Sequence, residues 1–295
     1  MHTWSCNDCG KRFRNQRRER GHEDLWFAYV FHKQTIREIA DSTGHDRKTL
    51  ELYLEAIVVP EKLHTPRSIH LVVDATYFGK RREGTGWGVV LFRDADEKEN
   101  LWWKYVQEEN MTHYREGKEK LEELGYTIIS VTCDGFSGNI PVFKGIPLQM
   151  CHFHMKQIVI RCTTLKPKTE AGQVLLALIR TLTYTTQDEF AERLRNFHVR
   201  YASFLNEKTH HPEGGWSYTH DGVRRGYFSV VHWFSYLFTY HHDRKTPNTT
   251  NTCDGHFSHV KDIVRIHRGL NRIQKQKVLD AIFLESTIAP KKKKK

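Results

Sequence analysis

The sequence predicts an α/β protein, in which a mixed β-sheet follows a small helical region and is interrupted by a long helical insertion. Two changes of pattern support this fold class. Residues 66–154 contain short runs of β-branched and aromatic residues separated by helical segments, whereas apolar residues recur at helical spacing in 22–60 and in 155–247. A chain of 295 residues is long enough for one large domain and one or two small ones.

Three helices are expected in the small helical region, residues 22–60. They cover Asp24–Phe31, Thr35–Ser42 and a segment from Asp46 to about Ile57. Gly44 suits a C-cap and Asp46 an N-cap. The short turn between the last two helices predicts a helix-turn-helix, whose second helix would present Arg47, Lys48 and Thr49 to a DNA groove. The alternative is an ordinary three-helix structural bundle.

Residues 1–21 form a basic arm that contains a partial zinc knuckle. Cys6 and Cys9 have the spacing of a metal-binding CxxC pair, and His22 lies where a third ligand would stand. No fourth ligand follows at the usual distance, so Zn²⁺ at Cys6 and Cys9 and a plain basic arm both stay open.

The core is expected to begin with residues 66–154. The predicted strands are Ser68–Phe78, Trp87–Phe92, Leu101–Gln107, Tyr126–Cys133 and Leu148–His152, with a helix over 112–124 and a short helix within 135–145. This order is that of a ribonuclease H-like domain. An all-helical insertion would follow over 155–247, then the last helices of the core over 248–285 and a lysine tail over 290–295.

Two aspartates mark the candidate active site. Asp74 interrupts an apolar strand, where a carboxylate is costly unless it is paired or bound to metal. Asp134 ends the fourth strand, which is expected to lie beside the first. Converging carboxylates need a cation or a shared proton, and oxygen ligands suit Mg²⁺ or Mn²⁺. The last strong helix begins near Asp254, which is the candidate third ligand, with Glu285 as a fallback.

At this point the chain resembles a known family, the Mutator-type bacterial insertion-sequence transposases of the DDE class. The resemblance rests on four stretches that span nearly the whole chain: the basic CxxC start, VVDATYFG, the pair VTCDGFSGN and QMCHFHMKQ, and PNTTNTCDGHFSHVKDIVRIHRGL. It implies an active site of Asp74, Asp134 and Asp254 that holds two Mg²⁺ or Mn²⁺ ions, supported by Cys151 and His154. The family commonly has glutamate at the third position, where this chain has Asp254.

The resemblance implies a function and partners. A homo-oligomer would bind the terminal repeats of its element, cleave the DNA strands and join them to target DNA. The net charge of +11, of which five charges lie in the lysine tail, favours a polyanionic partner. A merely basic protein, a non-catalytic DNA-binding derivative of a transposase, a zinc-finger regulator and a junction-resolving nuclease are the alternatives.

The sequence also bears on where the chain resides. It contains no apolar run of about 18 residues, so no membrane span is expected. The start of the chain lacks the apolar region of a secretory signal. A cytoplasmic, nucleoid-associated protein without disulfides is therefore expected.

Overall fold

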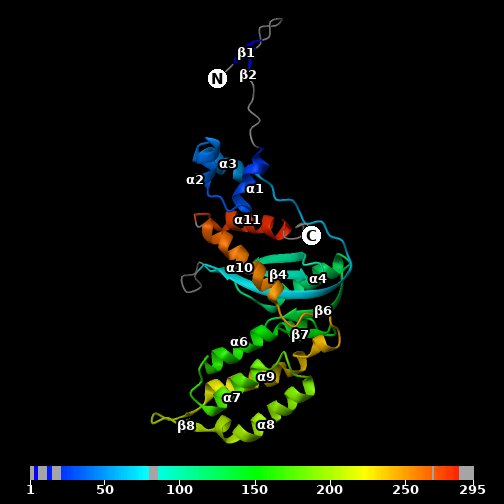
Figure 1. Cartoon of the computed structure of the whole chain (residues 1–295), viewed down its shortest axis with the longest axis vertical. Helices are drawn as coiled ribbons and strands as arrows, with labels where there is room; N and C mark the ends of the chain where they lie inside the picture. Colours follow the sequence, from blue (N-terminus) through cyan, green and yellow to red (C-terminus); the bar gives the residue numbers. More distant parts are fainter. Residues whose placement is uncertain (1–2, 6–11, 15–20, 80–85, 268, 286–295) are drawn as a thin grey trace. The chain divides into compact units, whose positions relative to one another are not determined.

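A computed structural model describes residues 3–5, 12–14, 21–79, 86–267 and 269–285 (Figure 1). Cys6, Cys9 and the lysine tail lie outside the described residues, and so does Arg268 of the HRG segment. The chain divides into two compact units. One contains Met1–Glu61 and His259–Lys295, and the other contains Lys62–Ser258.

The first unit contains the predicted amino-terminal helices. Its described elements are β1 (Thr3–Ser5), β2 (Arg12–Arg14), α1 (His22–Val30), α2 (Ile36–Thr43), α3 (Arg47–Ala56), the end of α10 (Asn251–Ile266) and α11 (Arg272–Glu285). Both predicted caps are confirmed. Gly44 closes α2 with φ 76°, a left-handed conformation that favours glycine, and the Asp46 side chain accepts the N–H of Thr49.

Residues 259–285 group with these helices, whereas the sequence placed all of 248–285 in the core. The reason is apolar packing. Helix α11 buries Val278, Leu279 and Ile282 and packs against α1, and the His267 Nε2–H donates to the carbonyl of Tyr29 at 3.0 Å. A sequence pattern shows that a helix has an apolar face but not which partner covers it.

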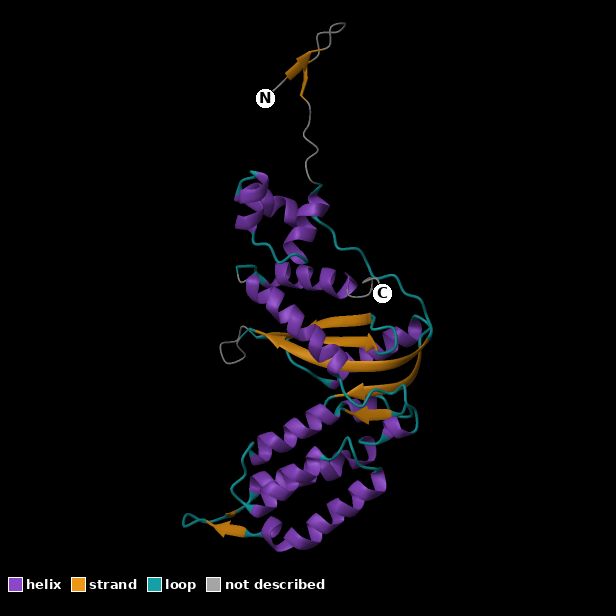
Figure 2. Ribbon diagram, viewed as in Figure 1, coloured by secondary structure: helices purple, strands orange, loops and turns teal. Residues whose placement is uncertain are grey.

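The second unit is built on a five-stranded mixed sheet of order β5-β4-β3-β6-β7 (Figure 2). The strands are β3 (Ser68–Phe78), β4 (Trp87–Asp94), β5 (Asn100–Val106), β6 (Thr127–Cys133) and β7 (Leu148–Met150). Neighbours β3–β4 and β4–β5 are antiparallel, and β3–β6 and β6–β7 are parallel. The predicted mixed α/β architecture and the pairing of the first and fourth strands are confirmed, and the order is consistent with a ribonuclease H-like sheet.

The two faces of this sheet differ in chemistry because side chains alternate along a strand. Ile69, Leu71 and Val73 of β3 join Tyr114 of α4 (Met111–Glu123) in the apolar core. The intervening side chains face the other side, and these include the buried His70 and Asp74. Only the second face therefore presents a carboxylate in the middle of the sheet.

Helices α6 (His152–Thr163), α7 (Glu170–Arg180), α8 (Gln187–Asn206) and α9 (Asp221–Trp233) form the insertion, with short 3-10 helices at Phe234–Tyr236 and Thr239–His241. The prediction of an all-helical insertion was wrong. Strands β8 (Lys208–His210) and β9 (Trp216–Tyr218) form a hairpin after α8. Its turn contains Gly214 and Gly215, both with positive φ, in a Pro-Glu-Gly-Gly turn signal that the aromatic periodicity of the region obscured.

Helix α6 begins at His152, so the fifth strand is two residues shorter than the predicted Leu148–His152. Consequently Cys151 is the N-cap of a helix and His154 lies in its first turn. Among the described residues, no helix is long and apolar enough to cross a membrane.

Candidate metal centre

Asp74 and Asp134 lie side by side because of the register of two parallel strands. Val72 of β3 pairs with Thr132 of β6, so two steps further along each strand bring Asp74 beside Asp134. Asp74 is 4% exposed, and its Oδ1 accepts the N–H of Ala75 at 2.9 Å. Oδ1 of Asp134 accepts the N–H of Phe136 at 3.0 Å. These backbone amides orient both carboxylates.

Asp254 reaches the same place through the loop 246–250, which is bonded to the sheet. The Thr246 hydroxyl donates to Ser130 at 2.8 Å, and the Thr132 hydroxyl donates to the carbonyl of Pro247 at 2.6 Å. The N–H of His152 donates to the carbonyl of Asn248 at 2.9 Å. Asp254 then lies in the first turn of α10, where the helix dipole favours a negative charge.

His154, in the first turn of α6, completes a group of potential metal ligands. One ligand atom each from Asp74, His154 and Asp254 lies within 4.8 Å of the other two, and no other such group exists among the described residues. Asp134 is outside this group but close enough to act on Asp74 through its charge. Glu285, the fallback ligand, is not a member.

Burial and like charges make this group unfavourable without a cation. Burial raises the pKa of Asp74 well above its usual value, and the charges of Asp134 and Asp254 raise it further, against the opposing effect of His154. Burial also raises the pKa of Asp134. Asp74 and Asp134 therefore ionise less readily than they would in water.

The Cys151–His154 pair partly offsets the acidic charge. Burial alone would lower the pKa of His154, but its hydrogen bond with Cys151 and the charges of Cys151, Asp74 and Asp134 raise the pKa to about 9. Burial opposes ionisation of Cys151, yet the hydrogen bond from His154 lowers the pKa of the thiol. The side chains thus support a positive imidazolium next to the carboxylates.

The donor set fits a divalent cation. Carboxylate oxygens suit Mg²⁺ and Mn²⁺, and the imidazole suits a transition metal such as Mn²⁺. A bound cation would relieve the repulsion that raises the pKa of Asp74. Asp74, Asp254 and His154 would hold the ion, with Asp134 beside them.

The other predicted site residues lie in the first unit. Arg47 and Lys48 are exposed at the start of α3, and Arg47 pairs with Glu51 at 2.7 Å. Thr49 is half-buried, and its hydroxyl donates to the capping Asp46 at 2.6 Å. The ring of His22, named as a third zinc ligand, stacks on Tyr53 at 4.0 Å between centroids. Among the three predicted DNA-contacting side chains, Thr49 is therefore engaged within the helix cap.

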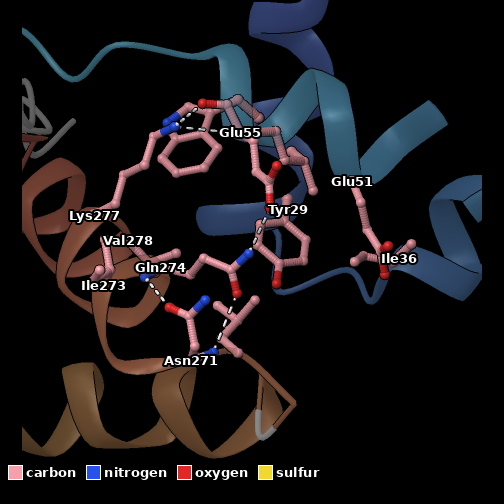
Figure 3. A pocket seen from close by; sticks show the side chains of 12 residues that line it. Tyr29, Ile36, Glu51, Glu55, Asn271, Ile273, Gln274, Lys277 and Val278 are labelled. Carbon is pink, nitrogen blue, oxygen red and sulfur yellow. Dashed lines mark hydrogen bonds between the residues drawn. The ribbon is translucent and has the colours of Figure 1, made fainter. Parts of the chain in front are cut away.

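A separate apolar pocket of about 260 Å³ lies in the first unit, between α1, α3 and α11 (Figure 3). Lys277 closes one side, where its ammonium donates to the carbonyls of Leu54 and Glu55 at 2.9 and 2.8 Å at the end of α3. Gln274 also donates to Glu55 at 3.0 Å. The Lys277 ammonium satisfies carbonyls at the end of α3, and Gln274 bonds the side-chain carboxylate of Glu55, so both residues have structural roles. The polar groups of this pocket therefore have a structural explanation, and the candidate catalytic groups are the carboxylates of the second unit.

The sequence gave His154 only a supporting role, indicated Thr250 only as part of the Thr-Thr-Asn loop, and gave no role to Thr246. Two signals were available: the Cys-x-x-His spacing puts both side chains in the first turn of a helix, and the Thr-Thr-Asn loop precedes Asp254. Neither signal shows that the loop bonds to β6, because the contacts join residues more than 100 positions apart.

No protein-family model matches the chain, and no curated protein matches it in sequence. Among solved structures, the chain is similar to a protein of the Drosophila P element transposase strand transfer complex. The identity is 10% and the TM-score is 0.43, and the match covers 95% of each chain. A similarity at this level establishes neither family nor function.

Proposed function

We propose that this chain is a transposase that cleaves DNA strands and transfers them at a divalent-metal centre formed by Asp74, Asp134, Asp254 and His154. The convergence of Asp74, His154 and Asp254 is the observation that carries the proposal. These residues come from a strand, the insertion and a late helix, and they meet on one face of the sheet. The motifs shared with Mutator-type DDE transposases supply the reaction class.

The proposed reaction has two steps of the same type. Water attacks a phosphorus atom at the end of the element, and the bond to the 3′-oxygen breaks to leave a 3′-hydroxyl. That hydroxyl then attacks a phosphorus atom of the target and displaces its 3′-oxygen. The bound cations, Mg²⁺ or Mn²⁺, would activate the attacking oxygen and stabilise the leaving one. Asp74, Asp134 and Asp254 would hold the cations, and His154 would complete the ligand set through its imidazole.

DNA binding is proposed for the first unit. Its helix-turn-helix, α2–α3, presents Arg47 and Lys48 as exposed cations at the start of the second helix. Cys6 and Cys9 are proposed to hold Zn²⁺. A homo-oligomer on paired element ends is the assembly we infer from the family resemblance.

Strand cleavage of an end-labelled duplex that carries the end of the element tests this function. Wild type is compared with Asp74→Asn and Asp254→Asn in Mg²⁺ and in Mn²⁺. Asp262→Asn is the matched control, because Asp262 is an exposed aspartate of the same helix α10 that pairs with Arg265. Loss of several kcal/mol of metal stabilisation corresponds to about 100- to 1,000-fold slower cleavage.

The possible outcomes distinguish an active transposase from a non-catalytic DNA-binding protein. Cleavage by wild type and by Asp262→Asn, but not by the other two variants, supports the proposal. If wild type binds the duplex and never cuts it, the non-catalytic DNA-binding derivative becomes the better function. If Asp254→Asn cuts like wild type, Asp254 is not a ligand.

A further inference from the structure

Thr250 contacts two of the candidate metal ligands, Asp254 and His154, although it is not itself a member of the ligand group. It is fully buried, in the loop just before α10. Its Oγ1 is 3.1 Å from Oδ2 of Asp254 and 3.2 Å from Nδ1 of His154. Its N–H donates to Sγ of Cys151 at 3.2 Å. One threonine therefore contacts the late helix and both members of the Cys-x-x-His pair.

The direction of these hydrogen bonds follows from the groups involved. An ionised carboxylate can only accept and is a stronger acceptor than sulfur, so the single proton of the Thr250 hydroxyl is donated to Asp254 rather than to Sγ of Cys151. The hydroxyl oxygen then has lone pairs to accept a hydrogen bond. Nδ1 of His154 fills that role only as Nδ1–H, and the same ring also forms a hydrogen bond with Cys151.

This arrangement determines which imidazole nitrogen is available to a metal. With Nδ1 engaged by Thr250, Nε2 is the ring nitrogen left to face a cation. In metal sites, the partner of the non-ligating nitrogen fixes both tautomer and ring orientation. The same hydroxyl restrains the carboxylate of Asp254, so it acts on two ligands together.

We propose that Thr250 is a positioning residue of the metal centre, whose hydroxyl donates to Asp254, accepts from Nδ1–H of His154 and so presents both groups to one cation. The inference rests on the proposed function, because it assumes that the centre binds a divalent cation. It goes beyond the three carboxylates by assigning the hydroxyl of the Thr-Thr-Asn loop a role in metal affinity.

Mn²⁺ binding to the full-length protein without DNA, measured by calorimetry, tests the role of the hydroxyl. Thr250→Val removes the hydroxyl and keeps the shape, Thr250→Ser keeps the hydroxyl, and Thr249→Val is the control at the adjacent half-buried threonine. We expect Thr250→Val to weaken Mn²⁺ binding about 10- to 100-fold. Binding by Thr250→Ser should stay within about threefold of wild type, and Thr249→Val should bind like wild type.

A purely structural role would lower the thermal midpoint of Thr250→Val and leave its Mn²⁺ affinity unchanged, and that result overturns the inference. If this variant does not fold, ¹⁵N NMR of wild-type His154 with Mg²⁺ decides. A hydrogen-bonded proton on Nδ1 supports the inference, and an Nδ1 without a proton contradicts it. If wild type itself binds no Mn²⁺ and cuts no DNA, the proposed function has failed. If wild type does both and Thr250→Val matches it, this inference alone has failed.

Discussion

Two groups of acids on the same sheet, each containing one buried aspartate, differ in how the protein compensates their charge. At the start of β3, Nη2 of Arg67 donates to Asp94 at 2.7 Å and to Glu99 at 2.5 Å, and Lys62 donates to Glu99 at 2.5 Å. Further along β3, Asp74 faces the negative charges of Asp134 and Asp254. The chain thus supplies its own cations to the first group, which we call the Arg67 cluster.

The two groups therefore differ in whether a bound cation would stabilise them. A buried carboxylate that accepts hydrogen bonds from a guanidinium is already compensated and gains nothing from a metal. A buried carboxylate beside two others gains from any cation that reaches it. Buried acids therefore do not by themselves indicate a metal centre. They indicate one where the protein supplies too few positive side chains to compensate their charge.

The largest predicted effect comes from breaking the Arg67 cluster. Asp94→Asn removes the 1%-exposed carboxylate that Arg67 contacts, whereas Arg67 keeps Glu99 as a partner, so we expect a loss of about 2–3 kcal/mol. Urea unfolding should show this loss in the free energy of unfolding, with Mn²⁺ binding intact. Asp96→Asn, at an exposed neighbour, is the control and should change stability by less than about 0.5 kcal/mol. Loss of Mn²⁺ binding in Asp94→Asn would show that the two groups are coupled.

The same substitution at Asp74 should have the opposite sign in the metal-free protein. Asp74→Asn removes a buried charge that Asp134 and Asp254 repel, so the metal-free protein should gain about 1–2 kcal/mol in the free energy of unfolding. Wild type should also be stabilised by Mn²⁺, by about 2.7 kcal/mol at 100 times its dissociation constant, and Asp74→Asn should lose this gain. A metal-free Asp74→Asn that is less stable than wild type contradicts this account of the site.

The features that depend on local sequence pattern were predicted from the sequence. The bounds of β3 were predicted as observed, because a run of apolar and β-branched residues between two polar segments is typical of a buried strand. The caps at Gly44 and Asp46 were predicted because each satisfies a defined backbone geometry. The pairing of β3 with β6 followed from the order of the elements, and it placed Asp74 beside Asp134.

Contacts between residues far apart in the chain were not predicted from the sequence. The local pattern does not show that Arg67, 27 positions away, compensates Asp94. The position of His154 within the ligand group depends on a loop that bonds to β6 across more than 100 residues. Similarly, the hairpin in the insertion and the membership of α11 in the first unit depend on tertiary packing that periodicity does not specify.

The smallest predicted effect is on how the stability of the metal-free protein depends on pH. This dependence distinguishes the two groups of acids directly. The pKa of Asp74 is raised by folding, so its contribution is complete below its unfolded pKa and is lost as pH rises through the folded pKa. For Glu99, the hydrogen bonds of Lys62 and Arg67 outweigh burial and lower the pKa, so its contribution is present above its unfolded pKa and is lost as pH falls.

Urea unfolding with a chelator between about pH 3 and 8 should therefore separate the two groups, with slopes of at most about 1.4 kcal/mol per pH unit for each proton. The stability advantage of Asp74→Asn over wild type should grow as pH rises. The deficit of Glu99→Gln should shrink as pH falls below about 4.5, with Glu97→Gln, at an exposed neighbour, as control. If both differences change with pH in the same direction, the two groups are neutralised alike, and the case for an external cation at Asp74 loses its physical basis.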